Sequence, residues 1–133
     1  MQPVTLHIIG DGESRDAFID SMRAAGVQVE FHGKIFDPAK RQAIFDRCDF
    51  GINMMKDSVC VGLTMKSLDY FAGGLPILNV NRENLKETAG RVVQLTPEEN
   101  FEMRKNTLEV FDALFSEQVF KEKLENTLDG LLN

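Results

Sequence analysis

The sequence has little cysteine, a deficit of positive charge and no long apolar run, and each shortage argues against a class of protein. Cys48 and Cys60 are the two cysteines among 133 residues, too few for a disulfide scaffold or a cysteine-rich metal site. Lys and Arg number 15 against 21 Asp and Glu, giving a net charge of −6. A nucleic-acid surface needs a positive field, so we expect no nucleic-acid partner. No apolar run approaches the roughly 20 residues of a membrane span.

The remaining composition is that of an ordinary globular domain. The apolar share is 43% and the charged share 27%, which argues against extended disorder. The opening Met-Gln-Pro-Val lacks the basic and apolar segments of a signal peptide. Repeats, linkers and low-complexity tracts are also absent from the sequence. We therefore expect a single domain over residues 1–133, in the cytoplasm.

Short β-branched runs alternate with segments of helical periodicity along the chain. Strands are expected at 4–9, 27–33, 50–54, 76–80 and 91–95. Helices are expected at 17–25, 38–45, 63–73, 97–115 and from 117 towards the C-terminus. This alternation predicts an α/β fold, a Rossmann-like, doubly wound, mainly parallel sheet of about five strands with helices on both faces.

The loop after the first expected strand is Gly10-Asp11-Gly12. Glycines at such a turn allow a phosphate or a ribose to approach the backbone closely. The full dinucleotide fingerprint would place a third glycine where Arg15 stands. Its acidic residue could be Glu30, which lies inside a strand rather than at its end. The motif alone is therefore equally compatible with a tight turn that caps the following helix.

The segment around the expected helix 63–73 combines a possible anion site with two charged residues. Its first amides, at 62–64, could bind an anion together with Lys66. Asp69 could accept hydrogen bonds from a ribose diol. The alternative to a ligand-binding role is that Lys66 and Asp69 form an exposed ion pair that only stabilises the helix. Met65 belongs to an apolar stripe that we expect to face the sheet.

Three segments taken together resemble a known family. They are Leu-His-Ile-Ile-Gly-Asp-Gly-Glu at 6–13, Val-Glu-Phe-His-Gly-Lys-Ile at 29–35 and Lys-Ser-Leu-Asp-Tyr-Phe-Ala-Gly-Gly-Leu-Pro-Ile at 66–77. In order and spacing, the stretch 4–93 resembles the C-terminal, donor-binding domain of group-1-type glycosyltransferases, which have the GT-B architecture. The resemblance implies that the protein binds a nucleotide diphosphate sugar and takes part in hexosyl transfer in polysaccharide biosynthesis. It also implies a retaining reaction that needs neither a metal nor a cofactor.

The resemblance also implies which residues bind the donor nucleotide. They are Gly10, Asp11, Gly12, Lys34, Ile35, Gly62, Leu63, Thr64, Lys66 and Asp69. Asp69 matches the second acid of the family's paired glutamates, which binds ribose hydroxyls. Val61 stands where the first glutamate, which contacts the donor sugar, is expected. The resemblance therefore identifies no catalytic residue.

The family's domain begins with one more strand and helix, and an acceptor-binding domain precedes it. The sequence contains neither, so we expect this chain to be inactive alone and to need that missing N-terminal domain as a partner. In its full-length form the protein is expected in the cytoplasm or at the membrane surface. A non-catalytic binding or assembly module of the same fold is the alternative function. A fragment of a dinucleotide-binding oxidoreductase is a third.

Two further features complete the expectations. His7 and His32 have no partner at metal-ligand spacing, so we expect structural histidines and no metal. The C-terminal part is unusually apolar for a pair of helices: Leu108, Phe111, Phe115, Phe120, Leu124, Leu128 and Leu131. Either these residues form a homodimer through the terminal helices or the tail packs onto the sheet.

Overall fold

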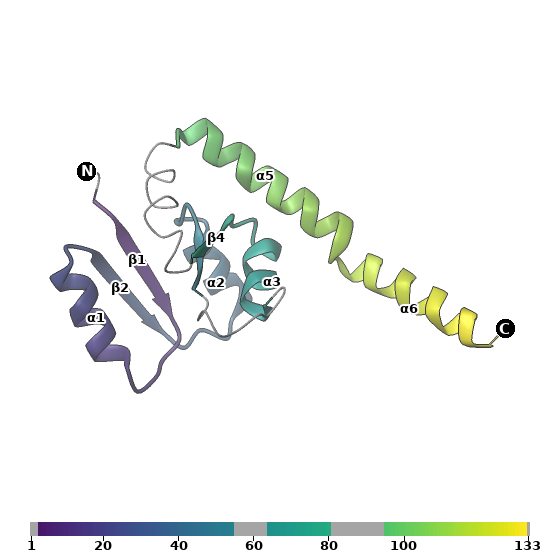
Figure 1. The fold of residues 1–133 in the computed structure, drawn as a ribbon, viewed down its shortest axis with the longest axis horizontal. Helices are drawn as coiled ribbons and strands as arrows, with labels where there is room; N and C mark the ends of the chain where they lie inside the picture. The colour runs from purple at the N-terminus through teal and green to yellow at the C-terminus, as the bar shows by residue number, and fades with distance from the viewer. Residues whose placement is uncertain (1–2, 55–63, 81–94, 133) are drawn as a thin grey trace. The chain divides into compact units, whose positions relative to one another are not determined.

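The computed structural model of the protein describes residues 3–54, 64–80 and 95–132 (Figure 1). The chain divides into two compact units, Met1–Cys48 and Asp49–Asn133. Both units mix helices with a pair of parallel strands. The protein therefore has a mixed α/β structure.

The first unit is a β-α-β arrangement followed by a helix. Strand β1 (Thr5–Ile9) pairs in parallel with β2 (Gln28–Gly33), and α1 (Arg15–Ala24) connects them and contacts β2. Figure 1 shows α1 beside this strand pair. Helix α2 (Pro38–Phe45) follows β2. These four elements match the sequence expectation.

Local sequence signals explain where the elements of this unit begin. Asp37 caps α2 by accepting a hydrogen bond from the Ala39 amide at 2.9 Å, and Pro38 occupies the first helical position. Ile19 of α1 and Phe45 of α2 are buried apolar side chains. The β1–β2 register shifts between Ile8 and Ile9, so β2 carries an extra residue there.

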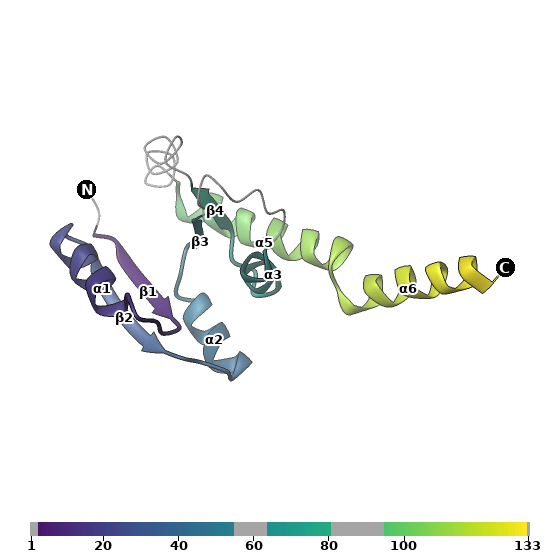
Figure 2. The ribbon, with the colours of Figure 1, turned by 60° about the horizontal axis from the view of Figure 1, so that its bottom comes forward.

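The second unit contains β3 (Gly51–Met54), α3 (Met65–Ala72), β4 (Ile77–Val80), α5 (Pro97–Leu114) and α6 (Glu117–Leu132). Strands β3 and β4 are parallel, with Gly51 opposite Ile77. Helix α3 contacts both strands on one side and α5 on another (Figure 2). Leu75, in the segment of chain that connects α3 to β4, is only 2% exposed.

The two C-terminal helices are separated by a short break. Thr96 and Glu99 form the expected capping box at the start of α5, with Pro97 at its first position. At the other end, Phe115 stacks on Phe71 of α3 with ring centroids 6.2 Å apart. None of the α6 side chains, all of which the structure describes, is buried.

The expected helix 63–73 requires two corrections. It begins at Met65, because the extended Thr64 caps it by accepting a hydrogen bond from the Ser67 amide at 3.2 Å. Residue 63 lies outside the described residues. Met65 is 79% exposed and does not face the sheet; Ser67 is the buried residue of the helix. The apolar spacing indicated the helix but did not predict which face is buried.

The described residues contain two parallel strand pairs rather than the complete expected sheet. The fifth expected strand, 91–95, falls almost entirely outside the described residues. A single doubly wound sheet therefore stays a prediction. Of the helices that the structure describes, none combines the length and apolar character needed to cross a membrane.

Candidate functional site

The loops after β1 and β2 are tied together by a backbone hydrogen bond. The Gly10 amide donates to the Gly33 carbonyl at 2.8 Å. Gly10 has a φ of 124°, a conformation that side-chain-bearing residues rarely adopt. The strands are parallel, so both loops lie at the carboxyl ends of their strands. This is the position at which parallel α/β sheets bind ligands.

A shallow surface hollow of about 400 Å³ lies at these loops. Its lining residues are Asp11, Gly12, Glu13, Arg15, Asp16 and Lys34. A Cβ atom added to Gly12 would meet no described atom within 4 Å. The space at the Gly12 α-carbon is therefore open to a ligand, while the Gly12 amide donates to Asp11 Oδ1 at 2.9 Å. Asp11 and Lys34, which come from different loops, line the same hollow.

Charges in the hollow are partly paired. The Arg15 Nε donates to Asp16 at 2.7 Å, and its Nη1 lies 3.4 Å from Asp11. The hydrogen bond lowers the pKa of the Asp16 carboxyl and raises the pKa of the Arg15 guanidinium. Lys34 is exposed and has no ion-pair partner among residues 3–54 that the structure describes. It is the cation of the hollow best placed to attract an anionic ligand.

Ile35 and Phe36 follow Lys34 in the chain, although neither is among the residues that line the hollow. Ile35 is half-buried. Phe36, which the sequence analysis did not single out, is 87% exposed. An aromatic ring so exposed, two residues from Lys34 in the chain, can stack on a base. The signal in the sequence that could have indicated Phe36 is an aromatic residue three positions after Gly33, which ends β2.

Thr64, Lys66 and Asp69 belong to the second unit. Thr64 is the N-cap of α3, so the amides without a helical acceptor are those at the start of this helix. Lys66 and Asp69 are both exposed, three residues apart. Gly62 and Leu63, like Val61, lie outside the described residues. The structure thus places Asp11, Gly12 and Lys34 around one hollow of the first unit, while Gly10 and Ile35 are not among its lining residues. The described candidates of the second unit lie at the start of α3 and along it.

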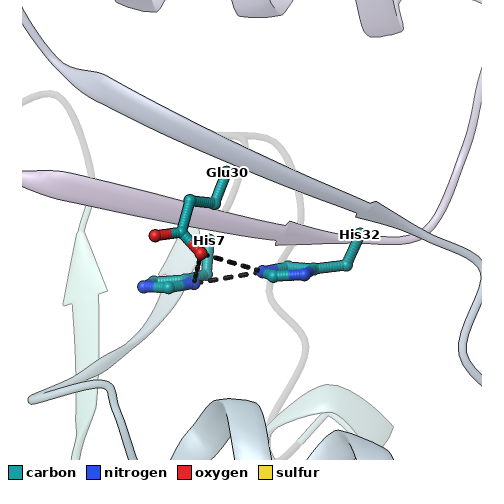
Figure 3. A group of neighbouring side chains, drawn as sticks. All are labelled: His7, Glu30 and His32. Atoms are coloured by element: carbon teal, nitrogen blue, oxygen red, sulfur yellow. Dashed lines mark hydrogen bonds and ion pairs between the residues drawn. The ribbon is translucent and has the colours of Figure 1, made fainter.

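The structure also assembles a cluster that was not predicted. His7, Glu30 and His32 come from adjacent strands and direct polar atoms at one another (Figure 3). His7 Nδ1 lies 3.1 Å from His32 Nε2 and 3.5 Å from Glu30 Oε2. His32 Nε2 lies 3.9 Å from the same oxygen. The expectation that the histidines lack partners is therefore revised, because strand pairing supplies them.

The cluster is mostly shielded from solvent. The side chains of His7 and His32 are 10% and 19% exposed, and that of Glu30 is 43% exposed. Burial lowers the pKa of His7, despite the opposing effect of Glu30. Arg47, which follows α2, places Nη2 3.0 Å from both Glu30 oxygens. The carboxylate is thus held in a defined orientation.

Comparisons of the chain with protein-family models, with curated proteins and with solved structures gave no match.

Proposed function

We propose that the chain binds the nucleotide part of a nucleotide diphosphate sugar, as the donor-binding domain of a GT-B-type glycosyltransferase. The observation that carries the proposal is the Gly10–Gly33 hydrogen bond. It joins two ligand-accessible loops at the carboxyl ends of parallel strands, and the shared hollow includes Asp11 and Lys34.

The first unit supplies contacts for the base and its ribose in this proposal. The open space at the Gly12 α-carbon permits close approach of the nucleotide, and Asp11 can accept hydrogen bonds from hydroxyl groups. The backbone at Lys34 and Ile35 holds the base. The exposed ring of Phe36 offers it a stacking surface.

The second unit supplies contacts for the phosphates and the ribose. Amides at the start of α3 and the Lys66 ammonium group favour an anion. Asp69, exposed three residues later, accepts hydrogen bonds from the ribose diol. The α3 amides and the Lys66 ammonium group would stabilise the nucleotide leaving group during retaining, metal-independent transfer. This transfer needs the acceptor-binding domain of a longer protein.

Calorimetric titration of the chain with UDP, GDP, ADP and NAD tests the proposal. We expect one of the nucleoside diphosphates to bind and NAD to bind more weakly. Asp69→Asn replaces the carboxylate by a neutral amide, whose oxygen can still accept a hydrogen bond, so the bond weakens by about 1–1.5 kcal/mol, which corresponds to roughly a fivefold to tenfold weaker affinity. Asp112→Asn, an exposed change on α5, is the matched control and should bind normally.

The alternatives give different results in the same experiment. Preferential binding of NAD would indicate the oxidoreductase alternative. Absence of binding by every nucleotide would indicate the non-catalytic module. Equal loss in Asp69→Asn and Asp112→Asn would remove Asp69 from the site.

A further inference from the structure

We propose that His7, Glu30 and His32 form a binding site for a divalent transition-metal ion, with Zn²⁺ as the best-suited ion. This site involves none of the residues assigned to the nucleotide. The test of this metal site is therefore independent of the test of the proposed function.

The spacing of the three polar atoms suits coordination of one ion. Nitrogen and oxygen ligands lie about 2.0–2.2 Å from Zn²⁺, so two ligands at a tetrahedral angle are about 3.3–3.5 Å apart. The distances in the cluster are 3.1, 3.5 and 3.9 Å. Shifts of a few tenths of an ångström would place His7 Nδ1, His32 Nε2 and Glu30 Oε2 around a common centre.

The strand pairing makes this arrangement a property of the fold. His7 is the register partner of Glu30 in the parallel β1–β2 pair, so their side chains lie on the same face. His32 follows Glu30 by two residues, which returns it to that face. The register shift passes from Phe31 to Gly33 and leaves His32 as the extra residue. Bulges of this kind redirect a side chain and are common beside functional sites.

The chemistry of the three groups selects the class of ion. Two imidazoles and one carboxylate suit Zn²⁺, and imidazole nitrogen is a poor ligand for Mg²⁺ or Ca²⁺. An imidazole coordinates a metal ion through a ring nitrogen that carries no proton, and His7 Nδ1 and His32 Nε2 are the nitrogens that face each other in the cluster. Arg47 orients the Glu30 carboxylate as outer partners of metal ligands do. Three protein ligands leave a fourth position for water or another small ligand.

A purely structural role is the competing explanation for the same contacts. Without an ion, one proton shared between His7 Nδ1 and His32 Nε2 accounts for their 3.1 Å separation. The two explanations differ in what happens when metal is added. A structural hydrogen-bonded pair would show no saturable response to Zn²⁺.

Nuclear magnetic resonance of the untagged full chain provides the direct test. His7 and His32 are its two histidines, so every imidazole signal comes from the cluster. We expect Zn²⁺ to bind with one-to-one stoichiometry and to shift Nδ1 of His7 and Nε2 of His32 in long-range ¹H–¹⁵N spectra. Unchanged imidazole signals in the presence of Zn²⁺ would overturn the proposal.

Variants and Co²⁺ spectroscopy identify the ligands independently. His7→Gln and His32→Gln should each weaken Zn²⁺ binding at least tenfold. Cys48→Ser combined with Cys60→Ser is the control and should bind normally. Co²⁺ should give d–d bands without a thiolate charge-transfer band. A thiolate band, or loss of binding only in the cysteine variant, would assign the metal to the cysteines and overturn the proposal.

Discussion

The ring of Tyr70 lies directly against the backbone of Gly51. A Cβ atom on Gly51 would come within 2.6 Å of Cγ and Cδ2 of Tyr70. The Tyr70 hydroxyl donates to the Ile52 carbonyl at 3.4 Å, which fixes the ring along β3. Because Tyr70 packs inward on α3, its neighbour Asp69 is left exposed. The contact thus orients the helix that carries the second group of candidate donor-binding residues.

Gly51→Ala is expected to destabilise the protein by about 1–3 kcal/mol, because the added methyl group displaces the Tyr70 ring. Urea unfolding followed by circular dichroism measures the change. Gly130→Ala is the matched control: this glycine is inside α6, and an added Cβ meets no described atom within 4 Å. It should leave stability unchanged or raise it by up to about 1 kcal/mol. Equal stability of both variants would contradict the close packing of Gly51.

Gly12→Ala is expected to weaken nucleotide binding without destabilising the fold. The position has ordinary backbone angles and space for a methyl group, so only a closely approaching ligand would be affected. Calorimetry and thermal unfolding measure the two effects separately. Gly10→Ala should instead lower stability by about 1–2 kcal/mol, because its φ of 124° is strained for alanine. Normal nucleotide affinity in Gly12→Ala would show that the ligand does not approach this loop.

Phe36→Leu is expected to weaken nucleotide binding by about 1–3 kcal/mol through the loss of base stacking. Since Phe36 is 87% exposed, stability should hardly change. Titration with the preferred nucleoside diphosphate measures the effect. Phe101→Leu, at an exposed phenylalanine of α5, is the control. If both variants bind alike, Phe36 has no part in the site.

Self-association through α6 is expected from the apolar stripe of this helix. Phe120, Leu124, Leu128 and Leu131 follow one another at helical spacing and are 65, 47, 49 and 78% exposed. A second copy presents the same stripe, so two α6 helices can pack together symmetrically. Multi-angle light scattering over a range of concentrations should show a dimer that Leu124→Glu dissociates. A monomer at every concentration would contradict this prediction.

Local signals in the sequence predicted the helix boundaries well where capping chemistry was explicit. Asp37-Pro38 and the Thr96–Glu99 capping box mark their helices correctly, because both depend on neighbours within a few residues. The contact of His7 with His32 was not predictable from spacing, since it depends on the register of two strands and a bulge. Met65 was misassigned because periodicity does not determine which face of a helix its neighbours cover.

The measurement that tests the central claim most directly is a ¹H–¹⁵N correlation spectrum of the chain recorded during titration with UDP, GDP and ADP. The account predicts that the preferred nucleotide saturably shifts the amides of Gly10, Gly12 and Lys34 in one unit. It predicts concurrent shifts of Lys66 and Asp69 in the other. No saturable shift with any of the three nucleotides, or shifts confined to residues outside these two groups, would contradict the claim.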